Sequence, residues 1–302
     1  MVKNLVLENI SVGFKLPQGV FYAVDDVSLS LPGGNFTAII GESGCGKSVL
    51  GQAILNILPS GVIKKGRVLY NGEQVKKILS AFGIIPQNPS ESLNPVRKIG
   101  KQMQDILDVH NIADSSNSYK KQCLRLFGLQ EAERVLAAYP HELSGGMLQR
   151  VLCAMAVSSK PEWILADEPT KGLDEQVDAV VRKNLLTIKQ DLHLSMLIIT
   201  HDIALAQEVC DDVLVMYAGQ VLEHNADIWH KPLHPYTKGF LQALPKNGLQ
   251  VIPGKAPVPG ESFTGCKFAA RCPYCTTRCK EEKPAMQQVG NAEVRCFLYA
   301  EG

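Results

Sequence analysis

The stretch 41–48 constrains the fold of this chain more than any other. It reads Gly-Glu-Ser-Gly-Cys-Gly-Lys-Ser and therefore has the spacing Gly-x-x-x-x-Gly-Lys-Ser, in which backbone N–H groups surround a phosphate chain. An apolar, β-branched run at 36–40 precedes it, and a helical pattern follows at 49–58. Since the N-terminus of a helix attracts anions, this strand, loop and helix predict a nucleotide site. Lys47 is expected to reach the β- and γ-phosphates, and Ser48 to bind Mg²⁺.

Charge and hydropathy restrict the class of protein. The 302 residues include 31 Lys and Arg against 30 Asp and Glu, a balance that gives no overall attraction to nucleic acid or to an anionic bilayer. No apolar run reaches the length of about 18 residues that a membrane span needs. The first residues lack the apolar core of a signal peptide. We therefore expect a protein that stays in the cytoplasm.

Alternating patterns predict an antiparallel sheet near the N-terminus. Residues 5–14 and 23–31 alternate between apolar and polar side chains, with a Pro-Gln-Gly turn between them. A further strand at 66–70 ends in an Asn-Gly turn. Phe14 near the end of the first strand could lie flat against an adenine ring, and Phe21 or Tyr22 could take its place. Each is also compatible with an ordinary position in a sheet.

The middle of the chain predicts a helical insert at about 96–158. Before it, a short strand at 83–85 breaks at a proline and leaves Gln87 at the break. Within it, Ser144 is a good N-cap for a long helix. The following glycines, Gly145 and Gly146, leave that helix start bare, which suits a terminal phosphate. The alternative is a flexible entry to a helix.

Two apolar strands are predicted to end in groups that can do chemistry. The first, at 163–168, ends in Asp167 and Glu168, and the second, at 195–200, is followed by His201. The carboxyl ends of parallel strands face the ligand crevice of an α/β sheet. Asp167 is expected to hold Mg²⁺ through water, Glu168 to deprotonate the attacking water, and His201 to contact the γ-phosphate. The alternative is a solvated turn and an ordinary surface histidine.

Five of the nine cysteines lie in the tail of the chain. Clustered thiols in a cytosolic chain favour a metal site over disulfides. Thiolates at Cys266, Cys272, Cys279 and Cys296 satisfy an iron–sulfur cluster or a zinc site equally well. Cys275 is then the spare thiol.

In their order along the chain, these motifs resemble one family, the ATP-binding cassette (ABC) ATPases, over residues 5 to about 222. The resemblance is carried by the phosphate loop, Gln87 at the Q-loop, the signature Leu143-Ser144-Gly145-Gly146, the Walker B ending Asp167-Glu168, Asp174 in the D-loop, and the switch His201. It implies catalytic roles for Glu168, His201 and Gln87. It implies Mg²⁺ ligands at Ser48, Gln87 and Asp167.

The resemblance also implies which residues contact ATP. Those of the chain's own site are Phe14, Gly41, Glu42, Ser43, Gly44, Cys45, Gly46, Lys47 and Ser48. Those that act in trans, on the ATP of a second cassette, are Ser144, Gly145, Gly146, Gln149 and Asp174.

Later segments resemble the subgroup of oligopeptide, dipeptide and nickel importer ATPases. They are 92–95, 231–241, 243–245 and the cysteine-rich stretch 265–273. In that subgroup the tail is associated with a 4Fe–4S cluster, and zinc is the alternative.

The resemblance implies an α/β fold with a phosphate-loop, RecA-like core, an antiparallel β subdomain, a helical insert and a cysteine-rich tail. The implied domains are the nucleotide-binding domain 1–224 and an extension 225–302. The implied function is ATP hydrolysis that powers uptake of peptides or of nickel and metal chelates. The implied partners are a second ATPase chain, identical or different, two permeases and an external binding protein, and nucleic acid is not among them. The implied location of this chain is the cytoplasmic face of the membrane. The alternatives are a soluble cassette acting on nucleic acid or ribosomes, with a zinc module, and a non-catalytic binding module.

Overall fold

The computed structural model describes residues 3–17, 19–74, 81–245, 248–258 and 261–300. Gln18, in the predicted hairpin turn, lies outside these ranges. The chain divides into two compact units. Unit 1 comprises 1–3, 32–36 and 75–209, and unit 2 comprises 4–31, 37–74 and 210–302. The domains expected from the sequence, 1–224 and 225–302, stay a prediction.

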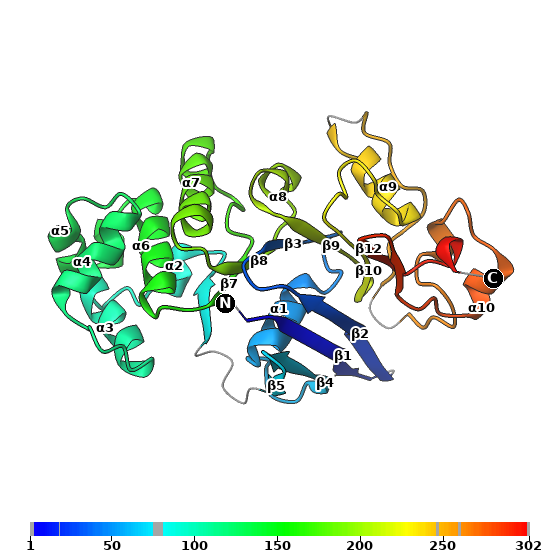
Figure 1. Ribbon diagram of the computed structural model, residues 1–302, viewed down its shortest axis with the longest axis horizontal. Helices are drawn as coiled ribbons and strands as arrows, with labels where there is room; N and C mark the ends of the chain where they lie inside the picture. The colour runs from blue at the N-terminus through cyan, green and yellow to red at the C-terminus, as the bar shows by residue number, and fades with distance from the viewer. Residues whose placement is uncertain (1–2, 18, 75–80, 246–247, 259–260, 301–302) are drawn as a thin grey trace. The chain divides into compact units, whose positions relative to one another are not determined.

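Unit 2 contains the predicted antiparallel sheet. Its strands lie in the order β2 (Gly19–Leu31), β1 (Leu5–Leu16), β4 (Ile63–Tyr70) and β5 (Glu73–Gln74), and each neighbouring pair is antiparallel. Helix α1 (Lys47–Leu55) packs against β1 and β2 (Figure 1). The predicted hairpin is therefore confirmed.

Helix α1 differs at both ends from the predicted range 49–58. It begins directly at Lys47, because Gly46 adopts a φ of 103° and turns the chain from the loop into the helix. It ends at Leu55, because Asn56 takes the left-handed conformation with a φ of 58° and its N–H bonds to the carbonyl of Ala53.

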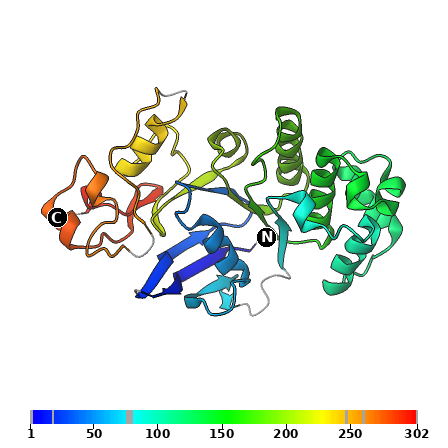
Figure 2. The ribbon, with the colours of Figure 1, turned by 180° about the vertical axis from the view of Figure 1, so that it is seen from behind.

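A second sheet of unit 2 includes residues from the C-terminal part of the chain. Its strand order is β11 (Gln287–Val289), β12 (Ala292–Val294), β10 (Gln220–Asn225), β9 (Asp212–Tyr217) and β3 (Phe36–Ile40). Strands β9 and β10 form an antiparallel hairpin, and β12 pairs with β10 in the antiparallel direction. The same strands are seen from behind in Figure 2. The C-terminal residues are thus hydrogen-bonded to the strand that ends the cassette pattern.

Helices α9 (Pro235–Gln242) and α10 (Thr277–Glu281) complete unit 2. Near α9, the fully buried rings of Tyr217, Tyr236 and Phe268 pack together with centroid distances of 4.6–5.4 Å. We call these three residues the aromatic cluster.

Unit 1 has a parallel sheet in the order β8 (Ser195–Ile199), β7 (Trp163–Asp167) and β6 (Phe82–Ile85). All three strands agree with the prediction. The helices of unit 1 are α2 (Pro89–Ser92), α3 (Ile99–Val109), α4 (Asn117–Leu126), α5 (Ala132–Ala137), α6 (Gly145–Ser158), α7 (Glu175–Asp191) and α8 (Ile203–Val209). Helices α3 to α6 lie together within the predicted insert (Figure 1).

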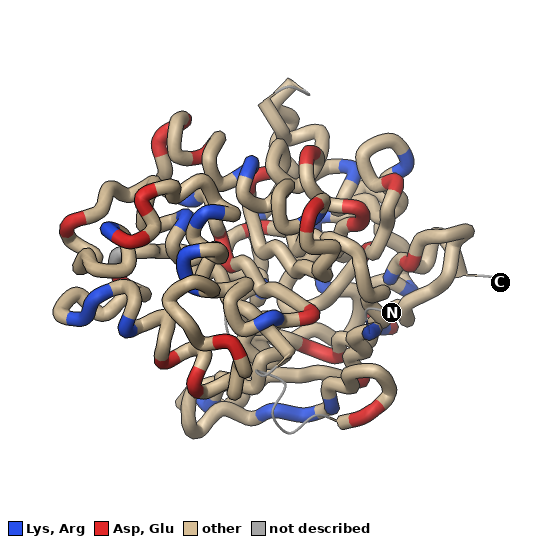
Figure 3. The backbone as a smooth tube through the Cα atoms, turned by 60° about the vertical axis from the view of Figure 1, so that its left-hand side comes forward, with Lys and Arg blue, Asp and Glu red and all other residues tan. Residues whose placement is uncertain are grey.

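Basic and acidic residues are interspersed along the chain (Figure 3), in keeping with the net charge of +1. Over the ranges that the structure describes, none of the helices combines the length and the apolar character that crossing a membrane requires.

Candidate functional site

The phosphate loop in unit 2 has a backbone that only glycine can adopt at two positions. At Gly41 φ is 151°, and a Cβ atom would lie 2.1 Å from the carbonyl oxygen of Met216. At Gly46 φ is 103°, and a Cβ atom would lie 2.1 Å from the carbonyl oxygen of Ala23. The loop is therefore packed directly on the backbone of β2 and β9.

Lys47 is buried, and its Nζ contacts the backbone of the phosphate loop. It donates hydrogen bonds to the carbonyl oxygens of Gly41 at 2.9 Å and Glu42 at 3.1 Å. Cys45 is buried as well, and burial raises the pKa of its thiol. The residues of the loop that are exposed are Ser43, Gly44 and Ser48. The loop thus presents glycine backbone and hydroxyl groups at its surface, as an anion site requires.

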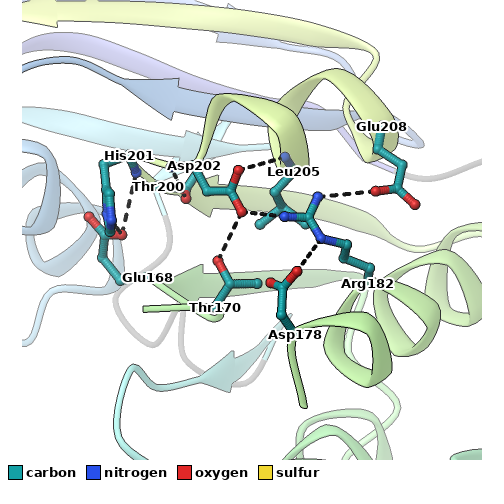
Figure 4. A network of polar contacts seen from close by, with 9 residues as sticks. All are labelled: Glu168, Thr170, Asp178, Arg182, Thr200, His201, Asp202, Leu205 and Glu208. Atoms are coloured by element: carbon teal, nitrogen blue, oxygen red, sulfur yellow. Dashed lines mark hydrogen bonds and ion pairs between the residues drawn. The ribbon is translucent and has the colours of Figure 1, made fainter. Parts of the chain in front are cut away.

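The predicted carboxylate and histidine meet in unit 1. Glu168 follows β7 in a left-handed conformation with a φ of 49°, and its N–H bonds to the carbonyl of Ile199 at 2.8 Å. Its Oε2 atom lies 2.5 Å from Nδ1 of His201 (Figure 4). Positive φ is costly for a residue with a side chain and concentrates at functional sites. The backbone therefore directs the Glu168 carboxylate towards His201.

Sequence reasoning missed an ion-pair network behind this pair. Arg182 of α7 bonds to Asp178 at 2.6 Å, to Glu208 at 3.1 Å and to Asp202 (Figure 4). Asp202 directly follows His201, and its Oδ1 accepts the N–H of Leu205 in the first turn of α8. The spacing of four residues between Asp178 and Arg182, which brings two side chains together on one face of a helix, was the available signal.

A hydroxyl joins this network from the segment after Glu168. Thr170 Oγ1 lies 3.5 Å from Oδ2 of Asp202. Arg182 thus holds Asp202 in place. Asp202 in turn contacts the segment after Glu168 and directly follows His201, so both segments are held by the same arginine.

The signature residues also lie in unit 1. Ser144 caps α6 as predicted, since its hydroxyl accepts the N–H of Met147 at 3.3 Å. Ser144 and Gly145 are exposed, so the helix start is open at the surface. Gln149 is fully buried, and its amide donates to the carbonyl of Pro169 at 3.4 Å. Asp174 caps α7 by accepting two backbone N–H groups at 3.0 Å.

The other predicted site residues divide between the units. Phe14 is half-buried in β1 and pairs in register with Phe21 of β2, in unit 2. Gln87 is exposed just after β6, in unit 1. Unit 2 thus holds the phosphate loop and Phe14, while unit 1 holds Gln87, Asp167, Glu168, His201 and the signature.

Four tail thiols line one cavity of about 170 Å³, namely Cys266, Cys272, Cys279 and Cys296. Burial raises the pKa of Cys266 to about 11, and the neighbouring thiols add to the shift. Cys275 is not among the lining residues. Within the described ranges, no group of three or more His, Cys, Asp or Glu is arranged to hold a metal ion.

Two family models match the chain. The model described as "ABC transporter" matches residues 24–171. The model described as "Oligopeptide/dipeptide transporter, C-terminal region" matches residues 222–279.

Characterised relatives match along nearly the whole chain. The oligopeptide transport ATP-binding protein OppD of Haemophilus influenzae is 34% identical and covers 98% of each chain. The dipeptide transport ATP-binding protein DppD of Escherichia coli is 36% identical over 95% of this chain and 94% of its own. The oligopeptide transport ATP-binding protein AppD of Bacillus subtilis is 35% identical over 98% of this chain and 97% of its own.

Solved structures show the same fold. The cbiO1 subunit of Clostridium perfringens, part of the transporter complex cbiONQ, matches with a TM-score of 0.62 and 26% identity over 74% of this chain and 89% of its own. The cassette MJ0796, in a dimeric post-hydrolysis state bound to ADP and Pi, matches with a TM-score of 0.60 and 25% identity over 73% of this chain and 97% of its own.

Proposed function

Since this chain belongs to the family of ABC transporter ATP-binding subunits that includes the oligopeptide and dipeptide transport proteins, we propose that it powers peptide import. The chain is an ATPase of the ABC type. The observation that carries the proposal is that peptide transport proteins match both its cassette and its C-terminal region. These relatives do not support nickel as the cargo, and they do not favour a cassette that acts on nucleic acid or ribosomes.

We place the phosphates of ATP at the phosphate loop and the adenine against Phe14. The packed glycine backbone and the exposed Gly44 and Ser48 support this placement. Lys47 is held beside the loop and needs only to exchange its carbonyl partners for phosphate oxygens.

The oxygen-bearing side chains of Ser48, Gln87 and Asp167 are of the type that Mg²⁺ prefers, and we propose that they hold it. The bound ion would neutralise charge on the phosphates.

In the proposed reaction, Glu168 is the general base. Its Oε2 atom accepts the proton of the attacking water, and His201 keeps that carboxylate in place through Nδ1. The positive φ at Glu168 and the hydrogen bond from its N–H to Ile199 fix the backbone that carries the carboxylate before substrate binds. His201 is 58% exposed in its side chain, so it remains accessible to the γ-phosphate. Gln87 is proposed to take part at the same phosphate.

We further propose that a second cassette, identical or different, completes the site. A bare helix start attracts anions, and the open N-terminus of α6 at Ser144 and Gly145 supports this role for the signature. Gly146, Gln149 and Asp174 are also proposed to act in trans, on the ATP of the partner cassette. The buried position of Gln149 and the capping role of Asp174 suggest that these two act by shaping the helix starts.

A groove of about 520 Å³ in unit 1 is proposed to receive a cytoplasmic helix of the permease, which would place the subunit peripherally on the inner face of the membrane. Residues of β6, α3 and α6 line it, among them Ile84, Ile106 and Met155, together with Leu93 just after α2. Ile84 and Val109 of this groove are exposed apolar side chains at 38% and 77%, and such surfaces mark protein contacts.

We propose that the four cavity thiols hold a 4Fe–4S cluster, with a zinc ion as the alternative. Cys275→Ser is the matched control, because that thiol does not line the cavity. Anaerobically purified wild type and Cys275→Ser are expected to contain iron and acid-labile sulfide, while Cys279→Ser loses them. One zinc per chain without a visible chromophore would contradict the cluster.

Co-expression with candidate permeases and an external peptide-binding protein tests the proposed function. We expect the chain to co-purify with the permeases, and peptide with its binding protein to raise ATP hydrolysis by the complex. Hydrolysis that responds to DNA or ribosomes and not to the peptide-loaded binding protein would refute peptide import.

A further inference from the structure

A buried arginine of the C-terminal extension reaches the phosphate loop within unit 2. The side chain of Arg271 is only 7% exposed, and its Nη1 lies 3.1 Å and 3.2 Å from the two carboxylate oxygens of Glu42. Glu42 is the second residue of the loop, and 229 positions separate the two partners. A charge-assisted contact of this kind is among the stronger polar contacts in proteins.

The arginine itself is rigidly held. Its Nε donates to the carbonyl of Pro253 at 3.1 Å, and Nη1 lies 3.3 Å from the hydroxyl of Tyr217. The guanidinium stands over the rings of Tyr217 and Phe268, at 5.7 Å and 5.9 Å from their centroids. A group fixed by this many contacts imposes its position on Glu42, rather than following a mobile side chain.

The same extension fixes the backbone of Glu42. Its N–H donates to the hydroxyl of Tyr236 at 3.2 Å, and Tyr236 belongs to the aromatic cluster that also supports Arg271. Both the backbone and the side chain of this loop residue are therefore held by residues that follow the cassette.

Glu42 poses an electrostatic difficulty that this contact resolves. A carboxylate in a loop that binds a triphosphate repels it, and the repulsion is strong where solvent is partly excluded. The proposed nucleotide site makes this repulsion unavoidable unless a cation neutralises Glu42.

We propose that Arg271 is a positioning residue for ATP binding, which neutralises Glu42 and turns its carboxylate away from the phosphates. The inference rests on the proposed function of the phosphate loop. It makes the affinity of the cassette for ATP depend on the C-terminal extension. Arg271 directly precedes Cys272, so the extension that carries the thiol cavity also controls the charge of the loop.

The test is MgATP binding and hydrolysis by the full-length chain carrying Arg271→Met, Glu42→Gln or both. Arg271→Met is expected to raise Kd and KM about fivefold, the effect of one unit charge at a partly screened site, with kcat unchanged within about twofold. Glu42→Gln is expected to bind at least as tightly as wild type. The double variant is expected to return to wild-type affinity, because no charge then needs neutralising.

Lys280→Met is the matched control, since it removes an exposed cation from the same extension. It is expected to bind ATP as wild type does. Wild-type affinity in Arg271→Met would overturn the proposal, as would a double variant as weak as Arg271→Met, which would mean that Arg271 only holds the extension together.

If Arg271→Met does not fold, the ATP affinity of Glu42→Gln tests the proposal without it. Weaker ATP binding by Glu42→Gln than by wild type would refute the electrostatic role of Arg271. Failure of the proposed function would be seen differently, as a wild-type chain that binds no ATP at all.

Discussion

Replacing Arg182 by methionine removes the cation that holds three carboxylates together in unit 1. Two of the ion pairs, to Asp178 and Asp202, are well shielded, with partner side chains only 25% and 24% exposed. The third, to Glu208, involves a partner that is 45% exposed. Methionine keeps much of the volume of the side chain, so the loss is mainly electrostatic.

The magnitude follows from these exposures. Hydrogen bonds to charged groups contribute about 1.5 kcal/mol each at the lower end of their range, and an exposed pair adds roughly 0.5 kcal/mol or less. Arg182→Met is therefore expected to lower the free energy of unfolding by about 3 kcal/mol. Because Asp202 adjoins His201, which is proposed to be catalytic, kcat for ATP is expected to fall about tenfold, as small displacements of catalytic groups are costly.

Urea unfolding and steady-state ATPase rates test this expectation. Arg134→Met is the matched control, because Arg134 pairs with Glu131 at the surface, where the two side chains are 74% and 69% exposed. The control is expected to lose less than about 0.5 kcal/mol and no activity. Equal effects of Arg134→Met and Arg182→Met would refute the shielded network as the cause.

Two further predictions concern unit 2. Burial alone would lower the pKa of His224, but the carboxylates of Asp212 and Glu293 raise it to about 9. The folded pKa exceeds the unfolded value of 6.5, so the charged imidazole stabilises the folded state fully below pH 6.5, and this stabilisation is lost as pH rises through 9. Urea unfolding should therefore show that the free energy of unfolding of wild type falls by about 2 kcal/mol more than that of His224→Gln over this interval. Gly46→Ala is expected to weaken ATP binding more than about tenfold in calorimetry, because the new Cβ would meet the Ala23 carbonyl; unchanged affinity would contradict the loop geometry.

Local sequence patterns predicted most elements that position the site. The phosphate loop, the hairpin of β1 and β2, and strands β7 and β8 depend on short-range spacing and on alternation of apolar residues, which a single sequence displays. The juxtaposition of Glu168 and His201 was also predictable, because both follow parallel strands of one sheet.

Helix ends were less predictable, because they depend on the conformation of single residues. Helix α1 stops at Leu55 because Asn56 adopts a positive φ. Helix α7 likewise ends at Asp191, two residues before His193, which also has a positive φ, of 51°. Composition alone does not reveal where a chain takes this conformation.

Contacts between distant residues were not predictable from the sequence. Arg271 and Glu42 carry no pattern that joins them, and their contact exists because the aromatic cluster brings the extension to the loop. Arg182 and Asp202 similarly meet through the packing of α7 against α8. Such contacts depend on tertiary packing, which no short-range periodicity records.

ATP hydrolysis by the assembled importer, compared between wild type and Glu168→Gln, tests most directly whether the Walker B carboxylate performs the chemistry. Glu162→Gln, at the opposite end of β7 and paired with Lys3, is the matched control. Glu168→Gln is expected to lower turnover about 100-fold or more, the usual contribution of a general base, while ATP still brings two cassettes together. Unimpaired hydrolysis in Glu168→Gln would contradict the role of Glu168 and the mechanism built on it.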